Sequence, residues 1–166
     1  THVAGLHHSL AGTVTDFSTS NSNVTLNSNK FVFYESQYGV GPDAKYHFIT
    51  SGDITLQSVG STFTTDQMGN THWQFYNISI SGSPKNVTIG KATDTSQYYW
   101  WADINATGSI KFYGKYVWLT TNTDLITTMA ASGTATRNTG ILLKSTERTY
   151  LQTNNILQTG GADITL

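Results

Sequence analysis

The segment YYWWADINATGSIKFYGKY, residues 98–116, decides which class of fold this chain adopts. Its even positions carry apolar side chains, at Tyr98, Trp100, Ala102, Ile104, Ala106, Ile110, Phe112 and Tyr116. Polar residues such as Asp103, Asn105 and Lys111 lie between them. Because successive side chains of a strand point to opposite faces, this period of two predicts strands that bury one face. Gly108 and Gly114 predict bends or bulges within the segment.

A short element with the same alternation recurs along the chain. A small residue, Asp, Ile, a polar residue and an apolar residue follow one another at residues 52–56, 102–106 and 162–166. Looser copies begin at Asn86, Gly108 and Thr139. The spacing between copies is irregular, so the sequence predicts many similar short strands rather than a strict solenoid repeat. Helix signals are nearly absent, because no long stretch carries apolar residues at the i, i+3, i+4, i+7 spacing.

Charged residues are rare in this chain of 166 residues: they make up 11% of it, against about 25% in typical soluble domains. The formal net charge is −1, and the 9 Lys and Arg residues are scattered along the sequence. Nucleic-acid binding needs basic side chains concentrated against phosphates, so we expect no nucleic-acid partner. Ser, Thr, Asn and Gly fill the polar positions and suit closely stacked strands, where like charges would repel. The absence of cysteine excludes disulfides and thiolate metal sites.

Composition shifts mildly near residue 50. Residues 1–50 hold an Asn- and Ser-rich stretch and an aromatic strand at residues 31–34, whereas residues 51–166 hold the recurring element. We therefore expect an N-terminal β region over 1–50 and a repetitive β-helical or β-prism region over 51–166, joined in one elongated body.

The segments GDITLQSVGS, ADINATGSIKF and GGADITL, which begin at Gly52, Ala102 and Gly160, resemble the strand repeats of bacteriophage tail spikes and tail fibres. The central spikes of contractile tails are similar in style. In those families three chains wind into a β-prism whose apolar residues meet on the three-fold axis. The resemblance covers roughly residues 51–166 and implies an all-β fold: an elongated, intertwined homotrimeric β-helix or β-prism.

The same resemblance implies a function. A tail fibre or spike is a structural and host-recognition component, located in the virion tail and therefore outside the cell. Its partners would be a bacterial surface glycan and other tail proteins, and it would need no cofactor. Membrane-piercing central spikes often end in a His-x-His metal site, and this sequence has no such motif. A binding fibre is therefore favoured over a piercing spike, which stays as an alternative.

A second interpretation needs no virus. Alternating strands also build β-sandwiches, so the chain could be a secreted single-chain carbohydrate-binding module with that fold. The oligomeric state distinguishes the two interpretations, because the tail protein would be a homotrimer and the module a monomer.

We expect no enzymatic activity. Glycoside hydrolysis needs two carboxylates that face one sugar bond, and the two glutamates, Glu35 and Glu147, lie in dissimilar contexts. Asp53, Asp103 and Asp163 belong to the recurring element, where a role in a turn or at a strand edge explains them. A polysaccharide-degrading tail spike is a third interpretation and would need paired carboxylates in a groove.

The aromatic run at residues 98–101 gives the candidate ligand-binding residues. On a strand, Tyr98 and Trp100 face one way and Tyr99 and Trp101 the other, so one pair must leave the local core. Exposed Trp and Tyr rings stack on sugars and also donate hydrogen bonds. The candidate glycan contacts are therefore Tyr99, Trp101, Trp73 and Trp118. A subunit interface or the core would explain these aromatic residues as well.

Metal binding is not expected. His7 and His8 are adjacent, so on a strand they would point to opposite faces and could not share a metal within one chain. In a trimer, three copies of either histidine could meet on the axis and bind a metal, which makes His7 and His8 the candidate ligands.

Overall fold

The computed structural model describes residues 4–8, 14–28, 31–35, 45–58, 72–75, 78–93, 97–100, 103–120, 122–132 and 138–166. The strands in these ranges are β1 (Ala4–His8), β2 (Val14–Ser18), β3 (Val24–Ser28), β4 (Phe31–Glu35), β5 (Lys45–Ile49), β6 (Ile54–Ser58), β7 (His72–Phe75), β8 (Ile78–Ser81), β9 (Val87–Ile89), β10 (Gln97–Trp100), β11 (Ile104–Ala106), β12 (Ile110–Leu119), β13 (Leu125–Thr127), β14 (Thr139–Leu151), β15 (Leu157–Gln158) and β16 (Asp163–Thr165). The described residues contain no helix, so the all-β prediction is confirmed. It follows that none of them forms a helix able to cross a membrane.

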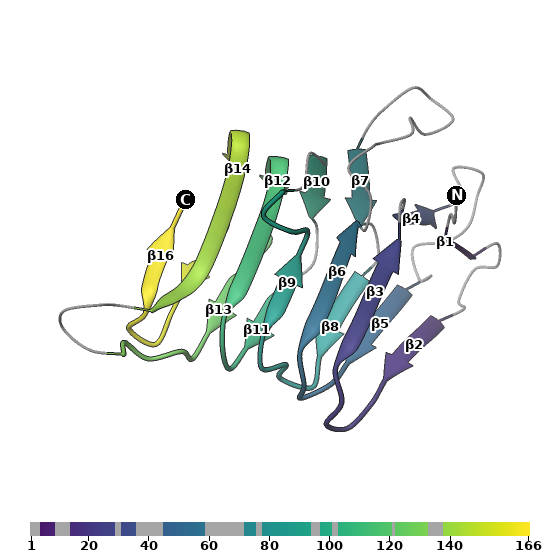
Figure 1. Ribbon diagram of the computed structural model, residues 1–166, viewed down its shortest axis with the longest axis horizontal. Helices are drawn as coiled ribbons and strands as arrows, with labels where there is room; N and C mark the ends of the chain where they lie inside the picture. The colour runs from purple at the N-terminus through teal and green to yellow at the C-terminus, as the bar shows by residue number, and fades with distance from the viewer. Residues whose placement is uncertain are drawn as a thin grey trace.

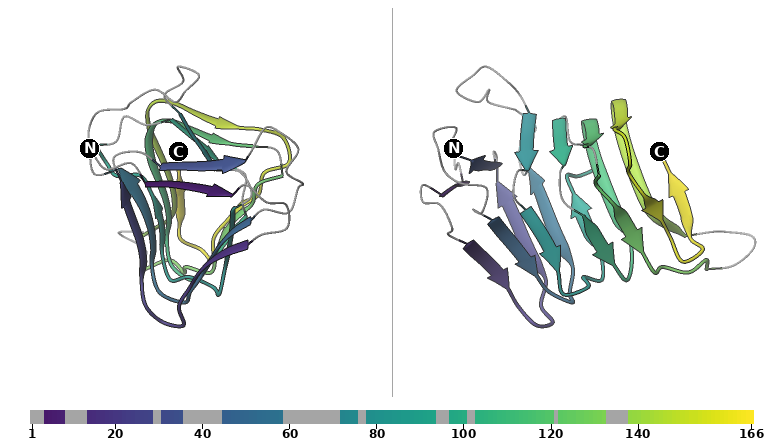
Figure 2. Two further views of the ribbon diagram at one scale, coloured as in Figure 1. Left: turned by 90° about the vertical axis from the view of Figure 1, so that its right-hand side faces the viewer. Right: turned by 180° about the vertical axis from the view of Figure 1, so that it is seen from behind.

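The strands stack in three parallel ladders along the molecule (Figure 1). The first ladder contains β1, β4, β7, β10 and the second halves of β12 and β14. The second contains β2, β5 and β8, beside which β11, β13 and β15 continue. The third contains β3, β6, β9, the first halves of β12 and β14, and β16. Each turn of the chain adds one strand to every ladder, which makes a parallel β-helix, seen end-on as nested coils in Figure 2.

This arrangement differs from the β-sandwich that was the alternative expected from the sequence. The sheets of a β-sandwich are antiparallel, whereas every ladder among the described strands is parallel. The described ladders join strands of one chain, and apolar side chains from all three faces of its coil meet inside it. One chain can therefore bury its own core.

Most copies of the recurring sequence element lie at one position of the coil. Along the third ladder the pairing joins one apolar residue per coil: Val24, Ile54, Val87, Ile110, Ile141 and Ile164. The copies that begin at residues 52, 86, 108, 139 and 162 all lie here, while the copy at residues 102–106 lies in β11 of the second ladder.

The spacing of the repeat is irregular, as the sequence indicated, although the strands stack in one β-helix. Successive residues of this ladder are 23 to 33 positions apart because the connections between strands vary in length. The pairing continues from coil to coil, with register shifts at Gly114/Tyr116 and at Thr139/Ile141.

The boundary expected near residue 50 falls inside a single coil. Residues 45–49 form β5 and residues 54–58 form β6 of that coil. Strand β3 pairs with β6 and β5 pairs with β8, so two ladders continue from one side of the boundary to the other. In this part of the chain the two predicted regions share one β-helix.

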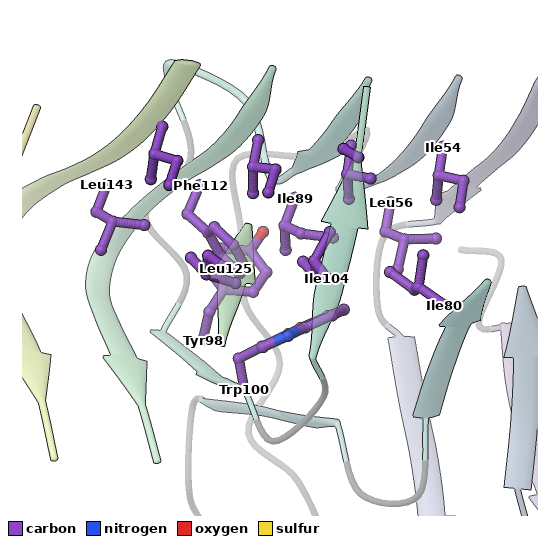
Figure 3. Packing of buried hydrophobic residues seen from close by; sticks show 14 of the residues in the cluster. Ile54, Leu56, Ile80, Ile89, Tyr98, Trp100, Ile104, Phe112, Leu125 and Leu143 are labelled. Carbon is purple, nitrogen blue, oxygen red and sulfur yellow. The ribbon is translucent and has the colours of Figure 1, made fainter. Parts of the chain in front are cut away.

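The core fills the interior of the coils (Figure 3). Side chains of the third ladder, such as Ile54, Ile89 and Ile110, are fully buried. Trp100 packs edge-on against Phe112, with ring centroids 5.4 Å apart and an interplanar angle of 77°. Full burial of one such side chain contributes about 1.5–3 kcal/mol, so these stacked columns are the main source of stability.

Polar side chains stack at the corners of the coils. Asn23 Oδ1 accepts a hydrogen bond from the Asp53 backbone N–H (2.9 Å), and Asn86 Nδ2 donates to Asp53 Oδ1 (2.9 Å). At another corner, Asp103 Oδ1 accepts from the Asp124 N–H (2.8 Å). The turn role expected for Asp53 and Asp103 is therefore confirmed: each carboxylate bonds to the neighbouring coil.

Candidate functional site

Two long strands carry the candidate site. Strands β12 and β14 each begin in the third ladder and end in the first, so both bend around a corner of the β-helix. The pairing passes from Gly114–Ser145 to Tyr116–Arg148, which leaves one extra residue in β14 opposite Lys115. This β-bulge lies at Gly114, where the sequence predicted one. Bulges turn side chains out of the regular alternation, and here Lys115 and Tyr116 both reach the outer surface.

Beyond the bulge, aromatic residues align across neighbouring strands. The register pairs Tyr99 of β10 with Trp118 of β12, and Trp118 with Tyr150 of β14. Tyr98, Trp100, Val117 and Leu119, which flank this row, are buried. The expectation that one pair of the aromatic run enters the core therefore holds for Tyr98 and Trp100.

The structure describes the four candidate glycan contacts to different extents. Trp118 is half-buried on the outer surface. Tyr99 shares its row, although its side chain lies outside the described part of the structure. Trp73 belongs to the adjacent row, with the buried Tyr98 and Val117, and its side chain is likewise not described. Trp101 lies outside the described residues.

Trp118 and Tyr150 form a stacked pair. Their ring centroids are 4.7 Å apart and their planes differ by 27°. Arg148 Nη1 donates a hydrogen bond to the Tyr150 hydroxyl at 3.0 Å. The pair thus presents ring surface together with a phenol and a guanidinium group, which combines apolar contact with hydrogen-bond donors.

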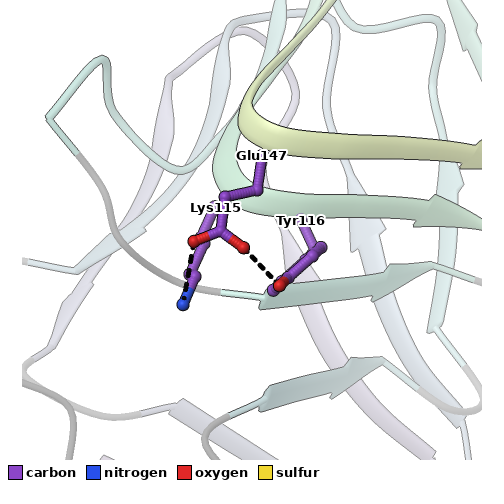
Figure 4. Close-up of polar contacts among 3 residues, drawn as sticks. All are labelled: Lys115, Tyr116 and Glu147. Carbon is purple, nitrogen blue, oxygen red and sulfur yellow. Dashed lines mark hydrogen bonds and ion pairs between the residues drawn. The ribbon is translucent and has the colours of Figure 1, made fainter.

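The bulge gathers three more polar groups beside this pair (Figure 4). Lys115 Nζ lies 3.1 Å from Glu147 Oε1, and the Tyr116 hydroxyl donates to Glu147 Oε2. Lys115 Nζ also lies 5.5 Å from the centroid of the Tyr116 ring, within range of a cation–π contact. One carboxylate therefore holds a lysine and a tyrosine together at the corner.

These contacts shift the ionisation of the cluster. Hydrogen bonds from Tyr116 and Lys115 hold the pKa of Glu147 below its usual range. The bond to Glu147 raises the pKa of Tyr116, because a phenolate would lie against the carboxylate. The same carboxylate raises the pKa of Lys115. At neutral pH the cluster holds one anion, one cation and a neutral phenol, and because the groups are exposed the pairing adds little stability.

Sequence reasoning missed most of this cluster. Tyr150, Arg148, Lys115 and Glu147 were not among the candidate glycan contacts, since none of them stands in an aromatic run. Their link to Trp118 depends on the pairing of β12 with β14, whose partners are about thirty residues apart. A signal did exist, because Ile110 and Ile141 of the recurring element are separated by a similar interval.

The histidine candidates can be placed only by their backbone. In β1, His7 pairs with Tyr34 and His8 with Glu35, and their side chains lie outside the described part of the structure. Among the residues that the structure describes, no three His, Asp or Glu side chains gather to hold a metal ion.

Comparison of the chain with known protein-family models, with curated proteins and with solved structures found no match in any of the three.

Proposed function

We propose that this chain is a β-helical recognition protein of a phage-type tail, which binds a bacterial surface glycan through the outer surface of β12 and β14. The stacked pair Trp118–Tyr150 is the observation that carries the proposal. Sugar rings offer apolar C–H faces and hydroxyl groups, and an aromatic pair with hydrogen-bond donors beside it complements both.

The scaffold also favours recognition. A parallel β-helix holds its side chains on continuous ladders, so the aromatic pair lies on regular strands rather than on a loop. Sites built on strands keep their geometry better than sites on loops. Among the described residues, the carboxylates of Asp53 and Asp103 bond to neighbouring coils, which favours binding over hydrolysis.

In this proposal the protein acts as a homotrimer, with other tail proteins as further partners and the virion tail, outside the cell, as its location. The β-helices of three copies would lie beside one another, since each coil closes on itself. Three identical sites would raise a weak affinity for a repetitive glycan through multivalency.

Binding to whole bacterial cells and to their purified surface polysaccharides tests the proposal. Trp118→Ala and Tyr150→Ala should each weaken binding about tenfold, equivalent to about 1.4 kcal/mol. Ile156→Ala is the control, because Ile156 is an exposed apolar residue that lies outside β12 and β14. Equal binding by all three variants and the unmodified protein would refute a role for the stacked pair.

Sedimentation separates this proposal from its alternatives. A trimer at micromolar concentration supports the tail protein. A monomer that still binds glycan through Trp118 would instead identify a secreted single-chain carbohydrate-binding module. Leakage of vesicles on addition of the protein, without glycan binding, would favour the membrane-piercing spike.

A further inference from the structure

Basic residues are concentrated on the two strands that carry the stacked pair. The chain has 9 Lys and Arg residues in total. Four of them lie in β12 and β14, at Lys111, Lys115, Lys144 and Arg148. In the sequence these residues look scattered, and the pairing of the strands brings them onto two neighbouring strands, with Lys111 and Lys144 before the corner and Arg148 beyond it.

The alternation of the strands directs these cations outward. Lys111 lies between the buried Ile110 and Phe112, and the exposed Lys144 follows the buried Leu143. Arg148 is exposed and pairs across the strands with Tyr116. Along the paired strands β12 and β14, the residues with basic groups therefore come before the stacked pair Trp118–Tyr150 on β12 and on β14.

Within the described ranges, most of this positive charge has no acidic partner. The carboxylate on this surface, Glu147, forms its ion pair with Lys115. Lys111, Lys144 and Arg148 have no ion pair in the described part of the chain. The surface therefore has three cations available to a ligand, in a protein whose formal net charge is −1.

Arg148 links the charge to the aromatic pair. It uses Nη1 to donate to the Tyr150 hydroxyl at 3.0 Å, which fixes the guanidinium at the edge of the stack. A guanidinium has five N–H donors in a planar fork that fits a carboxylate with two parallel bonds. An acidic group on a sugar stacked at Trp118 would lie within reach of this fork.

We propose that the ligand of this surface is an acidic polysaccharide, whose sugar rings contact Trp118 and Tyr150 and whose carboxylates bind Arg148 and Lys144. The inference rests on the proposed glycan-binding function and adds its substrate class. Neutral glycans would satisfy the aromatic pair and leave the cations without partners.

The test uses the full chain and polymers that differ only in charge. Polygalacturonate and hyaluronate are compared with their carboxyl-reduced forms by affinity electrophoresis and calorimetry. Carboxyl reduction should weaken binding at least about tenfold. Raising the salt concentration should weaken the binding of the acidic polymers only. Arg148→Gln and Lys144→Gln should each cost about threefold to tenfold on the acidic polymers. Lys144→Gln should leave binding of the reduced polymers unchanged.

Lys85→Gln is the matched control, since Lys85 is an exposed lysine outside β12 and β14. It removes the same charge and should leave every affinity unchanged. An equal loss in this variant would mean that overall charge governs binding, and would overturn the inference. Binding of single-stranded DNA as tight as that of the uronates would overturn it in the same way.

The inference and the proposed function fail in different ways. Equal affinity for native and reduced polymers, lost in Trp118→Ala, would refute the acidic class and retain glycan binding. Binding of the acidic polymers that is unaffected by Trp118→Ala would refute the aromatic contact and retain the charge. Failure to bind any of these polymers would overturn the inference, while binding to whole cells would still decide the proposed function.

Discussion

Asn122 and Asn154 occupy equivalent corners of two consecutive coils and both adopt the left-handed backbone conformation, with φ of 58° and 62°. Asn154 Nδ2 donates to Asn122 Oδ1 at 3.2 Å, and the Asn122 N–H donates to the Thr153 carbonyl at 3.2 Å. Asparagine tolerates this conformation better than other residues that carry a side chain, apart from aspartate. The corner therefore combines a strained backbone with a side chain that links the two coils.

Replacement of Asn154 tests this corner. Asn154→Ala should lower the free energy of unfolding by about 1–2 kcal/mol, because alanine is strained at positive φ and cannot bond to Asn122. Asn154→Gly loses the bond and relieves the strain, so it should cost less. The midpoint of urea denaturation measures both. The prediction is wrong if the glycine variant is the less stable of the two.

Ile110 tests whether the central column supplies the stability. It is fully buried between Val87 and Ile141 on the neighbouring strands. Ile110→Ala should cost about 2–5 kcal/mol through lost burial and the cavity left behind. Ile164 belongs to the same ladder but is 42% exposed, so Ile164→Ala should cost much less. Comparable losses in the two variants would contradict the gradient of burial along the ladder.

Asn86 tests the polar stacking at the corner. Its Nδ2 donates to Asp53 Oδ1, and its Oδ1 accepts from the backbone N–H of Ser109 at 2.8 Å. Asn86→Ala leaves these partners unsatisfied and should cost about 1–3 kcal/mol in thermal or urea unfolding. Asn105→Ala is the control, since Asn105 is exposed on β11. An unchanged stability in Asn86→Ala would mean that water replaces the side chain at no cost.

Tyr116 and Glu147 give a prediction about pH. Because the pKa of Tyr116 is raised, the phenol should lose its proton at higher pH than an ordinary tyrosine. Its bond to Glu147 therefore stabilises the fold below pH about 10 and is lost as the pH rises through the shifted value. NMR titration of labelled tyrosine measures this, and Glu147→Gln should return the pKa of Tyr116 toward its usual range. No difference between the two proteins would refute the contact.

The stability that Glu147 contributes through the same contact depends on pH in the opposite direction. The pKa of Glu147 is lowered, so the stability from its two hydrogen bonds is present above the ordinary glutamate pKa and is lost as the pH falls through the lowered value. Glu147→Gln should therefore differ from the unmodified protein at neutral pH and match it in acid. Thermal unfolding at several pH values checks the convergence, and the effect should be small because the groups are exposed.

The sequence by itself determined the local features. The alternation in residues 98–116 predicted strands, the burial of Tyr98 together with Trp100, and a bulge at Gly114, because side-chain direction depends on the next residue along the strand. Most copies of the recurring element marked residues of one ladder, because each of these copies supplies a strand with the same alternation.

Only the tertiary structure decided how the strands combine. The alternation is the same whether a strand pairs with its own chain or with another, so the sequence could not separate a single-chain β-helix from an intertwined trimer. The contact between Trp118 and Tyr150, and the gathering of Lys111, Lys144 and Arg148, depend on the register between β12 and β14. That register is set by hydrogen bonds between coils that lie 23 to 33 residues apart, with connections of unequal length between them.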